Sequence, residues 1–116
     1  MATIIHKNVW RWGKTDTIII DGGRGMVNIS IENEDSSIAY LSGISVVEDR
    51  RNLGFGNLLL HLAKGHANEM GAKELHLWAD PNQWVFDWYK RHWFCENGTN
   101  EDGLVKLVFD LRKGGH

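Results

Sequence analysis

The sequence predicts an α/β protein with a mixed, mostly antiparallel sheet and helices packed on it. In the N-terminal part, apolar and polar residues alternate as they do in strands with one wet face, most clearly in residues 26–32. After Gly56, apolar residues recur every three or four positions, which is the period of a helix. The two patterns meet at a glycine-rich junction, residues 51–57. A strand–helix–strand order of this kind favours a central pair of parallel strands.

Four strands are expected first, and they should pair as an antiparallel meander. Segments rich in glycine, asparagine, aspartate and serine separate them, as turns require. The expected strands are residues 4–12, 15–20, 26–32 and 38–47, and the expected turns are residues 13–14, 22–25 and 33–37.

Two helices and three further strands are expected in the rest of the chain. The first helix should cover the sheet and end at Gly71, because glycine is the usual terminator of a helix. An Asn-Gly pair is a strong signal for the turn of a hairpin. The expected helices are residues 58–70 and about 83–92, and the expected strands are residues 74–79, 94–97 and 105–112, the last two joined across Asn97-Gly98.

A chain of 116 residues is large enough for one hydrophobic core and too small for two, so we expect a single domain, residues 1–116. We divide it into N-terminal strands (1–37), a cofactor-binding and catalytic core (38–94), and a C-terminal hairpin and tail (95–116).

The composition excludes several classes of protein. With 24% charged residues and a net charge of −2, the chain lacks the basic surface expected of a nucleic-acid-binding protein. No apolar run approaches the roughly 20 residues needed to span a membrane, and residues 1–12 lack the apolar centre of a signal peptide. We therefore expect a cytoplasmic protein. Cys95 is the only cysteine, which excludes an internal disulfide and a multi-cysteine zinc site.

The glycine-rich junction has the properties of an anion site. Gly54 and Gly56 let backbone N–H groups approach an anion closely, and the helix that follows adds its unpaired amides and the positive end of its dipole. Arg50 and Arg51 make the local field positive. We expect a phosphate-bearing ligand here. The simpler alternative is a tight strand-to-helix turn without a ligand.

At this point the residues resemble those of the GNAT superfamily of acyl-CoA-dependent N-acyltransferases. The family's pyrophosphate signature, Gln/Arg-x-x-Gly-x-Gly/Ala, is matched in register by Arg51, Gly54 and Gly56. Asn82 and Tyr89 stand seven residues apart, as in the family's Asn-x-x-Ala-x-x-x-Tyr pattern, and Phe94 falls where its Gly-Phe pair ends. The resemblance covers residues 38–111 and implies the GNAT fold with acetyl-CoA as co-substrate.

The resemblance also implies roles for individual residues. Ile44 would direct its backbone N–H at the thioester oxygen, next to a bulge at Gly43, and Tyr89 would protonate the departing thiolate or hydrogen-bond to its sulfur. No metal is implied. The residues implied to bind the cofactor are Ile44, Ser45, Val46, Arg51, Asn52, Leu53, Gly54, Phe55, Gly56, Asn57, Asn82 and Tyr89.

The chain departs from the family pattern on the acceptor side. Tyr40 occupies the position where many members carry a glutamate that serves as general base. Ser42, Glu32 or Glu48 could act through water, so we assign no base. Residues 12–26 are too short and too β-like for the helical pair that commonly forms one wall of the acceptor site.

Three functions are compatible with these patterns. The first is an N-acetyltransferase that moves acetyl from acetyl-CoA to a primary amine of a small molecule or a protein by direct attack. The second is a non-catalytic acyl-CoA-binding regulatory module that acts on a protein partner. The third, a domain that binds ATP or a dinucleotide, is disfavoured because neither the P-loop ending nor the full Gly-x-Gly-x-x-Gly fingerprint is present.

Four tryptophans cluster around the second expected helix. Core packing is the default expectation for them. The alternative is an aromatic wall of the acceptor site or the surface of a homodimer, because tryptophan is enriched at interfaces. These residues are Trp78, Trp84, Trp88 and Trp93.

Overall fold

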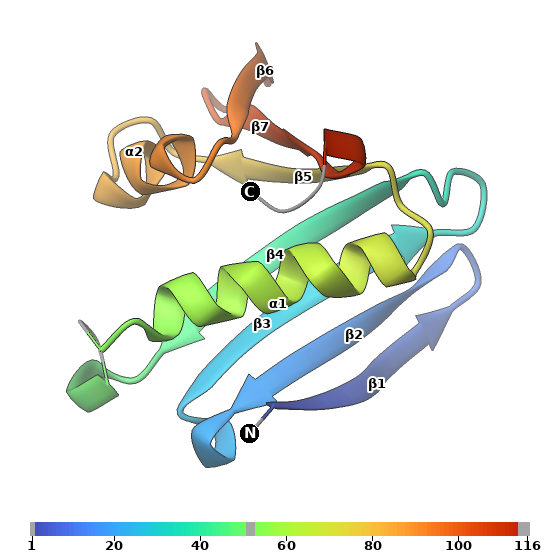
Figure 1. Cartoon of the computed structure of the whole chain (residues 1–116). Helices are drawn as coiled ribbons and strands as arrows, with labels where there is room; N and C mark the ends of the chain where they lie inside the picture. Colours follow the sequence, from blue (N-terminus) through green and yellow to red (C-terminus); the bar gives the residue numbers. More distant parts are fainter. Residues whose placement is uncertain (1, 51–52, 114–116) are drawn as a thin grey trace.

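A computed structural model describes residues 2–50 and 53–113. Seven strands form one sheet in the order β1-β2-β3-β4-β5-β7-β6, and two α-helices pack on it (Figure 1). The strands are β1 (Ala2–Trp10), β2 (Gly13–Ile20), β3 (Gly25–Glu32), β4 (Ile38–Val46), β5 (Glu74–Ala79), β6 (Cys95–Thr99) and β7 (Val105–Asp110); the helices are α1 (Phe55–Glu69) and α2 (Trp84–Arg91), with short 3₁₀ turns at Asp21–Gly23, Glu48–Arg50 and Leu111–Lys113.

The predicted fold class is confirmed. Strands β1 to β4 form an antiparallel meander, and β5, β7 and β6 form a second antiparallel group. The two groups meet at β4 and β5, which are the only parallel neighbours in the described sheet. Helix α1 connects these two strands and lies across one face of the meander (Figure 1).

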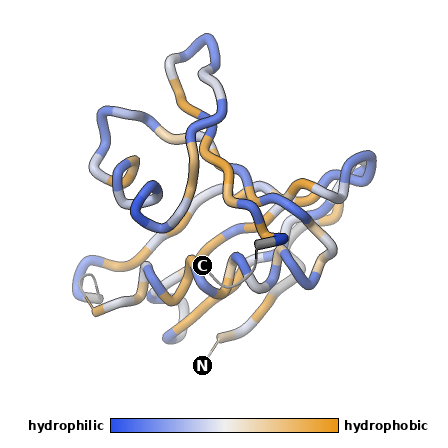
Figure 2. Tube along the Cα trace, turned by 45° about the horizontal axis from the view of Figure 1, so that its top comes forward, coloured by the Kyte–Doolittle hydropathy of each residue, from blue (hydrophilic) through white to orange (hydrophobic). Residues whose placement is uncertain are grey.

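The core lies between α1 and the sheet because one stripe of the helix and alternate positions of the strands are apolar. Leu59, Leu60 and Ala63 of α1 are fully buried, as are Val27 and Ile29 of β3. Burying one large aliphatic side chain stabilises the fold by roughly 1.5–3 kcal/mol. Figure 2 shows the same partition along the chain, with apolar segments in the strands and hydrophilic residues at the loop ends.

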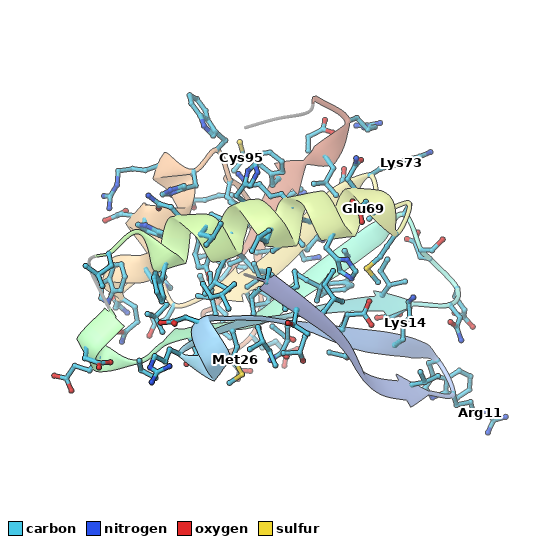
Figure 3. The ribbon with its side chains drawn as sticks, turned by 60° about the horizontal axis from the view of Figure 1, so that its bottom comes forward. Arg11, Lys14, Met26, Glu69, Lys73 and Cys95 are labelled. Atoms are coloured by element: carbon cyan, nitrogen blue, oxygen red, sulfur yellow. The ribbon has the colours of Figure 1, made fainter. Side chains whose placement is uncertain are left out.

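The opposite face of the meander is lined by polar side chains. Thr15 and Ser30 share a hydrogen bond of 2.8 Å, and the Thr17 hydroxyl donates to the Asn28 side-chain oxygen at 2.6 Å. Met26 also points away from α1 on this face (Figure 3). The period-two pattern of the sequence therefore separates an apolar face under the helix from a hydrogen-bonded polar face.

Two turns lie elsewhere than predicted. Gly13 and Lys14 belong to β2, and the chain reverses at Arg11 and Trp12, at the tip of the β1–β2 hairpin (Figure 3). The Asn33 backbone N–H donates to the Trp12 carbonyl at 2.6 Å, and its side-chain amide donates to the Arg11 carbonyl at 3.2 Å. A neighbouring loop thus stabilises this turn, which no local residue pattern indicates.

The predicted turn at Asn97-Gly98 is also wrong, because β6 continues through both residues to Thr99. The hairpin turns instead around Asn100. The Asn100 side-chain oxygen accepts the N–H groups of Asp102 and Leu104, each at 2.9 Å, and its backbone N–H donates to the Leu104 carbonyl at 2.9 Å. Asparagine stabilises such loops by mimicking a backbone carbonyl.

A buried hydrogen bond joins α1 to β2. Nε2 of His66 lies 2.7 Å from a carboxylate oxygen of Asp16, whose side chain is only 1% exposed. The His66 side chain is 11% exposed, so it is partly packed between α1 and the sheet. Buried carboxylates require partners of this kind.

A buried lysine lies where α1 meets the end of α2. The Lys64 ammonium donates to the His92 carbonyl at 3.0 Å and stands 3.8 Å above the ring of Phe109. The residue is 9% exposed. Burial lowers the pKa of Lys64 from 10.5 to about 8, because the charged form loses its hydration.

We expect the stability of the fold to depend on this group. Below pH 8 the buried Lys64 ammonium destabilises the folded state. Between pH 8 and 10.5 Lys64 is deprotonated in the folded chain but still protonated in the unfolded chain, so the free energy of unfolding rises with pH. Relative to Lys64→Met, the wild type should gain about 2 kcal/mol of unfolding free energy between pH 7 and pH 10. Denaturant titrations across this range measure the difference. Lys73→Met, which removes an exposed lysine near the end of α1 (Figure 3), is the control, and identical pH slopes in all three proteins would contradict the expectation.

Candidate active site

The strand-to-helix junction follows β4. Gly54 adopts the left-handed conformation, with φ of 82°, and is the N-cap of α1. The helix begins at Phe55, three residues earlier than predicted, and the Leu58 N–H donates to the Gly54 carbonyl at 3.0 Å. Gly54 has no side chain to cap the helix, and the first amides of an α-helix have no partner within the helix, which suits them to bind an anion. Arg51 and Asn52 lie outside the described residues, and their expected role in binding pyrophosphate stays a prediction.

Strand β4 contains a bulge at the expected place. Val27 pairs with Ile44, and Ile29 pairs with Leu41, so the single residue between them on β3 faces Ser42 and Gly43 together. Gly43 has φ of 105°, which favours glycine because it has no β-carbon. Two residues opposite one define a β-bulge, and it bends the strand locally.

Beyond the bulge, β4 runs away from β5. Ile38 to Tyr40 pair with Glu74 to His76, and no further pairing of these two strands is present in the described sheet, although β4 continues to Val46 and β5 to Ala79. Figure 1 shows the strands diverging toward the end where α2 lies. The parallel pair is therefore splayed.

The Ile44 N–H points toward β5 rather than toward β3. Val47 donates its N–H to the Arg24 carbonyl at 2.9 Å, so residues 24 and 47 stand at a hydrogen-bonded position of the ladder, joined by this one bond. Hydrogen-bonded and non-bonded pairs alternate along an antiparallel ladder. Ile44 lies three residues from Val47 and pairs with Val27, so Val27 and Ile44 form a non-bonded pair. The Ile44 N–H therefore faces the gap between β4 and β5.

Tyr89 lies on α2, which follows β5. It is 6% exposed and packs edge-on against Trp88 and Phe94, with ring centroids 5.1 and 5.5 Å away. Burial raises the pKa of Tyr89 to about 12. The phenol is therefore protonated at neutral pH and can donate a hydrogen bond.

Asn82 is exposed in the turn that leads into α2, and its backbone N–H donates to the Asp80 carboxylate at 2.9 Å. Of the other expected cofactor-binding residues, Ser45 and Leu53 are exposed, while Val46 and Phe55 are partly buried against the core. In residues 2–50 and 53–113, no group of three or more histidine, cysteine, aspartate or glutamate side chains could hold a metal ion.

Comparison with known proteins identifies the family. The sequence model described as the Acetyltransferase (GNAT) family matches residues 21–94, which is more than half of the 116 residues. The chain belongs to the GNAT family. No curated protein sequence matches the chain.

Solved structures share the GNAT fold at low sequence identity. A GNAT family protein from Desulfovibrio desulfuricans is 14% identical with a TM-score of 0.73, over 86% of this chain and 69% of that one. The ribosomal-protein-S18-alanine N-acetyltransferase of Escherichia coli is 14% identical with a TM-score of 0.71, over 96% and 94% of the two chains. A Bacillus subtilis acetyltransferase in complex with CoA is 19% identical with a TM-score of 0.68, over 84% and 76%.

In this GNAT chain, contacts that the sequence did not indicate join α2 to the start of α1. His92 lies 2.8 Å from the Trp88 carbonyl through Nδ1 and 2.9 Å from the Asn57 side-chain oxygen through Nε2. A β-carbon on Gly56 would lie 3.4 Å from the Trp88 ring. Asn57 and Gly56 belong to the expected pyrophosphate loop, so α2 packs directly on that loop. The only sequence signal was the four-residue spacing of Trp88 and His92.

Trp93 stands where the Gly-Phe pair of the GNAT pattern has its glycine. Its φ is 74°, in the left-handed region, at a cost of roughly 1–2 kcal/mol for a residue with a β-carbon. The Phe94 N–H still donates to the Tyr89 carbonyl at 3.3 Å. The substitution therefore leaves the turn behind Tyr89 in place.

The expected core packing of the tryptophans is correct only for Trp88, which is partly buried against the core. Trp84, Trp93 and Trp78 are 74%, 64% and 43% exposed. These three side chains are thus exposed rather than part of the core.

The expected acceptor side of this GNAT domain carries Tyr40 and a histidine that the sequence did not single out. His76 packs edge-on against Tyr40, with ring centroids 5.6 Å apart, at the last pair before the splay. Its Nε2 lies 2.8 Å from the Glu74 carboxylate. Burial, Glu32 and Asp35 raise the pKa of Tyr40, so it is a neutral phenol and not a base. The glutamates considered as bases, Glu32 and Glu48, are exposed.

Replacing Gly54 tests the junction as a cofactor site. Gly54→Ala places a β-carbon at φ of 82°, at a strain of roughly 1–2 kcal/mol, which the loop relieves by moving its amides. We expect affinity for CoA to fall about 5- to 20-fold, measured by calorimetric titration.

The matched control is Gly71→Ala, at the other end of α1. Gly71 has φ of 91°, and, as at Gly54, an added β-carbon would meet no heavy atom within 4 Å. It should show similar destabilisation with unchanged affinity. Equal loss of CoA affinity in both variants would mean that Gly54→Ala acts by destabilising the fold in general and not by changing the junction.

Proposed function

We propose that the protein is an N-acetyltransferase that moves acetyl from acetyl-CoA to a primary amine by direct attack. The observation that carries the proposal is the splay of β4 from β5, with the Ile44 N–H directed into the gap between them and the Gly54 junction following β4 in the chain. Membership in the GNAT family and the CoA complex of the Bacillus subtilis protein support acetyl-CoA as the donor.

CoA would lie along β4 with its pyrophosphate at the start of α1. The pantetheine arm would enter the splay and pair with the backbone of Ile44 and Val46, almost as an added strand. The first amides of α1 would bind the diphosphate because their N–H groups have no partner earlier in the helix. Acetyl-CoA would supply the activated thioester when bound.

The reaction consists of one addition and one elimination. The amine lone pair attacks the thioester carbon, a C–N bond forms, and the Ile44 N–H stabilises the developing oxyanion. The C–S bond then breaks, and the electron pair leaves with sulfur. The ammonium proton passes to water, and the thiolate finally takes a proton, so that the products are an amide and CoA thiol.

The structure favours hydrogen bonding over full proton transfer as the role of Tyr89. A thiol has an ordinary pKa near 8.5. Burial raises the pKa of Tyr89 to about 12, so transfer of its proton to a thiolate is uphill. A hydrogen bond from the phenol still stabilises the charge that grows on sulfur.

Turnover across a panel of amines tests the proposal. The panel comprises a polyamine, an amino sugar, a lysine peptide and a free peptide N-terminus, and thiol release reports acetyl transfer. At least one amine should raise thiol release well above the rate of acetyl-CoA hydrolysis. CoA binding without turnover on any amine would contradict the proposal and favour the non-catalytic module. The sequence observation that supports this alternative is Tyr40 at the usual position of the glutamate.

Tyr89→Phe should lower kcat on the order of 100-fold, because a donor to the leaving sulfur is lost. Affinity for CoA should stay within about twofold, since the ring packing against Trp88 and Phe94 is retained. Steady-state kinetics and CoA titration measure the two quantities. Unchanged kcat would remove Tyr89 from the mechanism.

The pH profile gives a second readout on the same variant. Since burial raises the pKa of Tyr89 to about 12, the phenol keeps its proton throughout the range from pH 7 to pH 10. The ratio of wild-type kcat to Tyr89→Phe kcat should therefore be constant over that range. A ratio that falls toward one near pH 10 would show that Tyr89 ionises there and would contradict the assigned role.

A further inference from the structure

Asn28 is the residue of β3 that faces the bulge. Its neighbours Val27 and Ile29 pair with Ile44 and Leu41, which leaves Asn28 opposite both Ser42 and Gly43. The extra residue of a bulge interrupts the hydrogen-bond ladder. A side chain on the facing strand can supply a donor that the ladder no longer provides.

The Asn28 side chain supplies that donor. Its Nδ2 group donates to the Ser42 carbonyl at 3.3 Å, and a β-carbon built on Gly43 would lie 3.7 Å from the same nitrogen. The amide thus lies alongside the bulge and contacts its backbone.

Thr17 of β2 orients this amide. The Thr17 hydroxyl donates to Oδ1 of Asn28 at 2.6 Å, and Thr17 is only 4% exposed. A hydroxyl that donates to the carbonyl end leaves the NH₂ end facing Ser42. The three residues therefore form a chain of hydrogen bonds from β2 through β3 to the bulge in β4.

The Ser42 carbonyl is close in the chain to the amide that acts on substrate. It shares a peptide plane with the Gly43 N–H, and only the two backbone torsions of Gly43 separate that plane from the one that carries the Ile44 N–H. Gly43 is at φ of 105°, and glycine has more conformational freedom than any other residue. Restraint from outside the strand is needed to hold this hinge in one conformation.

We infer that Thr17 and Asn28 are positioning residues that hold the Gly43 bulge so that the Ile44 N–H is aimed at the thioester oxygen. The inference rests on the proposed acetyl transfer, and it assigns to the polar face of the meander a role in catalysis. Neither residue touches the substrate in this mechanism, because both act through the backbone of residues 42–44.

The chain contains a matched control for the Thr17–Asn28–Ser42 chain of hydrogen bonds, called the strut below. Thr15 and Ser30 form a hydrogen bond of 2.8 Å between the same two strands and on the same face, two residues along from Thr17 and Asn28. Ser30 pairs with Tyr40, so this bond does not reach the bulge. Thr15→Val removes the same kind of hydroxyl at a comparable place in the sheet.

Four variants separate positioning from general stability. Asn28→Asp keeps the acceptor for Thr17 but places a carboxylate oxygen against the Ser42 carbonyl, and Thr17→Val removes the hydroxyl without changing shape. Loss of a whole oxyanion donor costs about 10²–10³ in kcat. A change in the direction of the Ile44 N–H should therefore lower kcat roughly 10- to 100-fold in Asn28→Asp and in Thr17→Val. KM for acetyl-CoA should stay within about twofold, and Thr17→Ser and Thr15→Val should retain wild-type kcat.

An amide NMR spectrum provides a readout that does not depend on turnover. The Gly43 and Ile44 resonances should shift in Asn28→Asp and Thr17→Val and stay in place in Thr15→Val. Wild-type kcat in the first two variants, unmoved Gly43 and Ile44 resonances, or an equal loss in Thr15→Val would each overturn the inference. If the wild type binds CoA but turns over no amine, the proposed function fails on that result, while the resonances still decide whether the strut controls the bulge.

Discussion

The feature on which the rest of the structure depends is the short pairing of β4 with β5. Strand β4 pairs with β3 to its end but with β5 only up to Tyr40, and the bulge at Gly43 follows directly. A parallel pair that separates in this way leaves backbone groups of β4 facing a gap in the sheet. The chain that leaves this strand at Val46 leads to the Gly54 junction, so β4 is the element next to both expected contacts with CoA.

A splayed sheet must be held together at its wide end, and side chains of the two helices do this. Lys64 of α1 binds the carbonyl of His92, and His92 contacts Asn57 at the start of α1. Trp88 packs against Gly56. The helix that carries Tyr89 thus packs on the loop expected to bind pyrophosphate. These contacts, and not the sheet, set the position of the phenol relative to that loop.

The sequence predicted the order and type of the elements because the periods of two and 3.6 are strong over most of the chain. It failed at the turns near Gly13 and Asn97, where side chains of Asn33 and Asn100 from the loops decide where the strands reverse. It failed for Trp84 because helical spacing alone does not say which face of α2 is covered. It singled out neither Asn28 nor Thr17, since a polar residue in a strand is most simply explained as solvated.

By itself, the sequence determined the order of strands and helices, the glycine junction and the register of Tyr89 with Asn82, because these depend on local spacing along the chain, and its resemblance to the GNAT family implied the fold. Only the tertiary structure decided which polar groups meet. The Thr17–Asn28–Ser42 chain joins three strands, and the pair of His66 with Asp16 spans 50 positions in the sequence. Such contacts depend on strand register and on how far each side chain is removed from water, and both are properties of the assembled sheet and not of any segment alone.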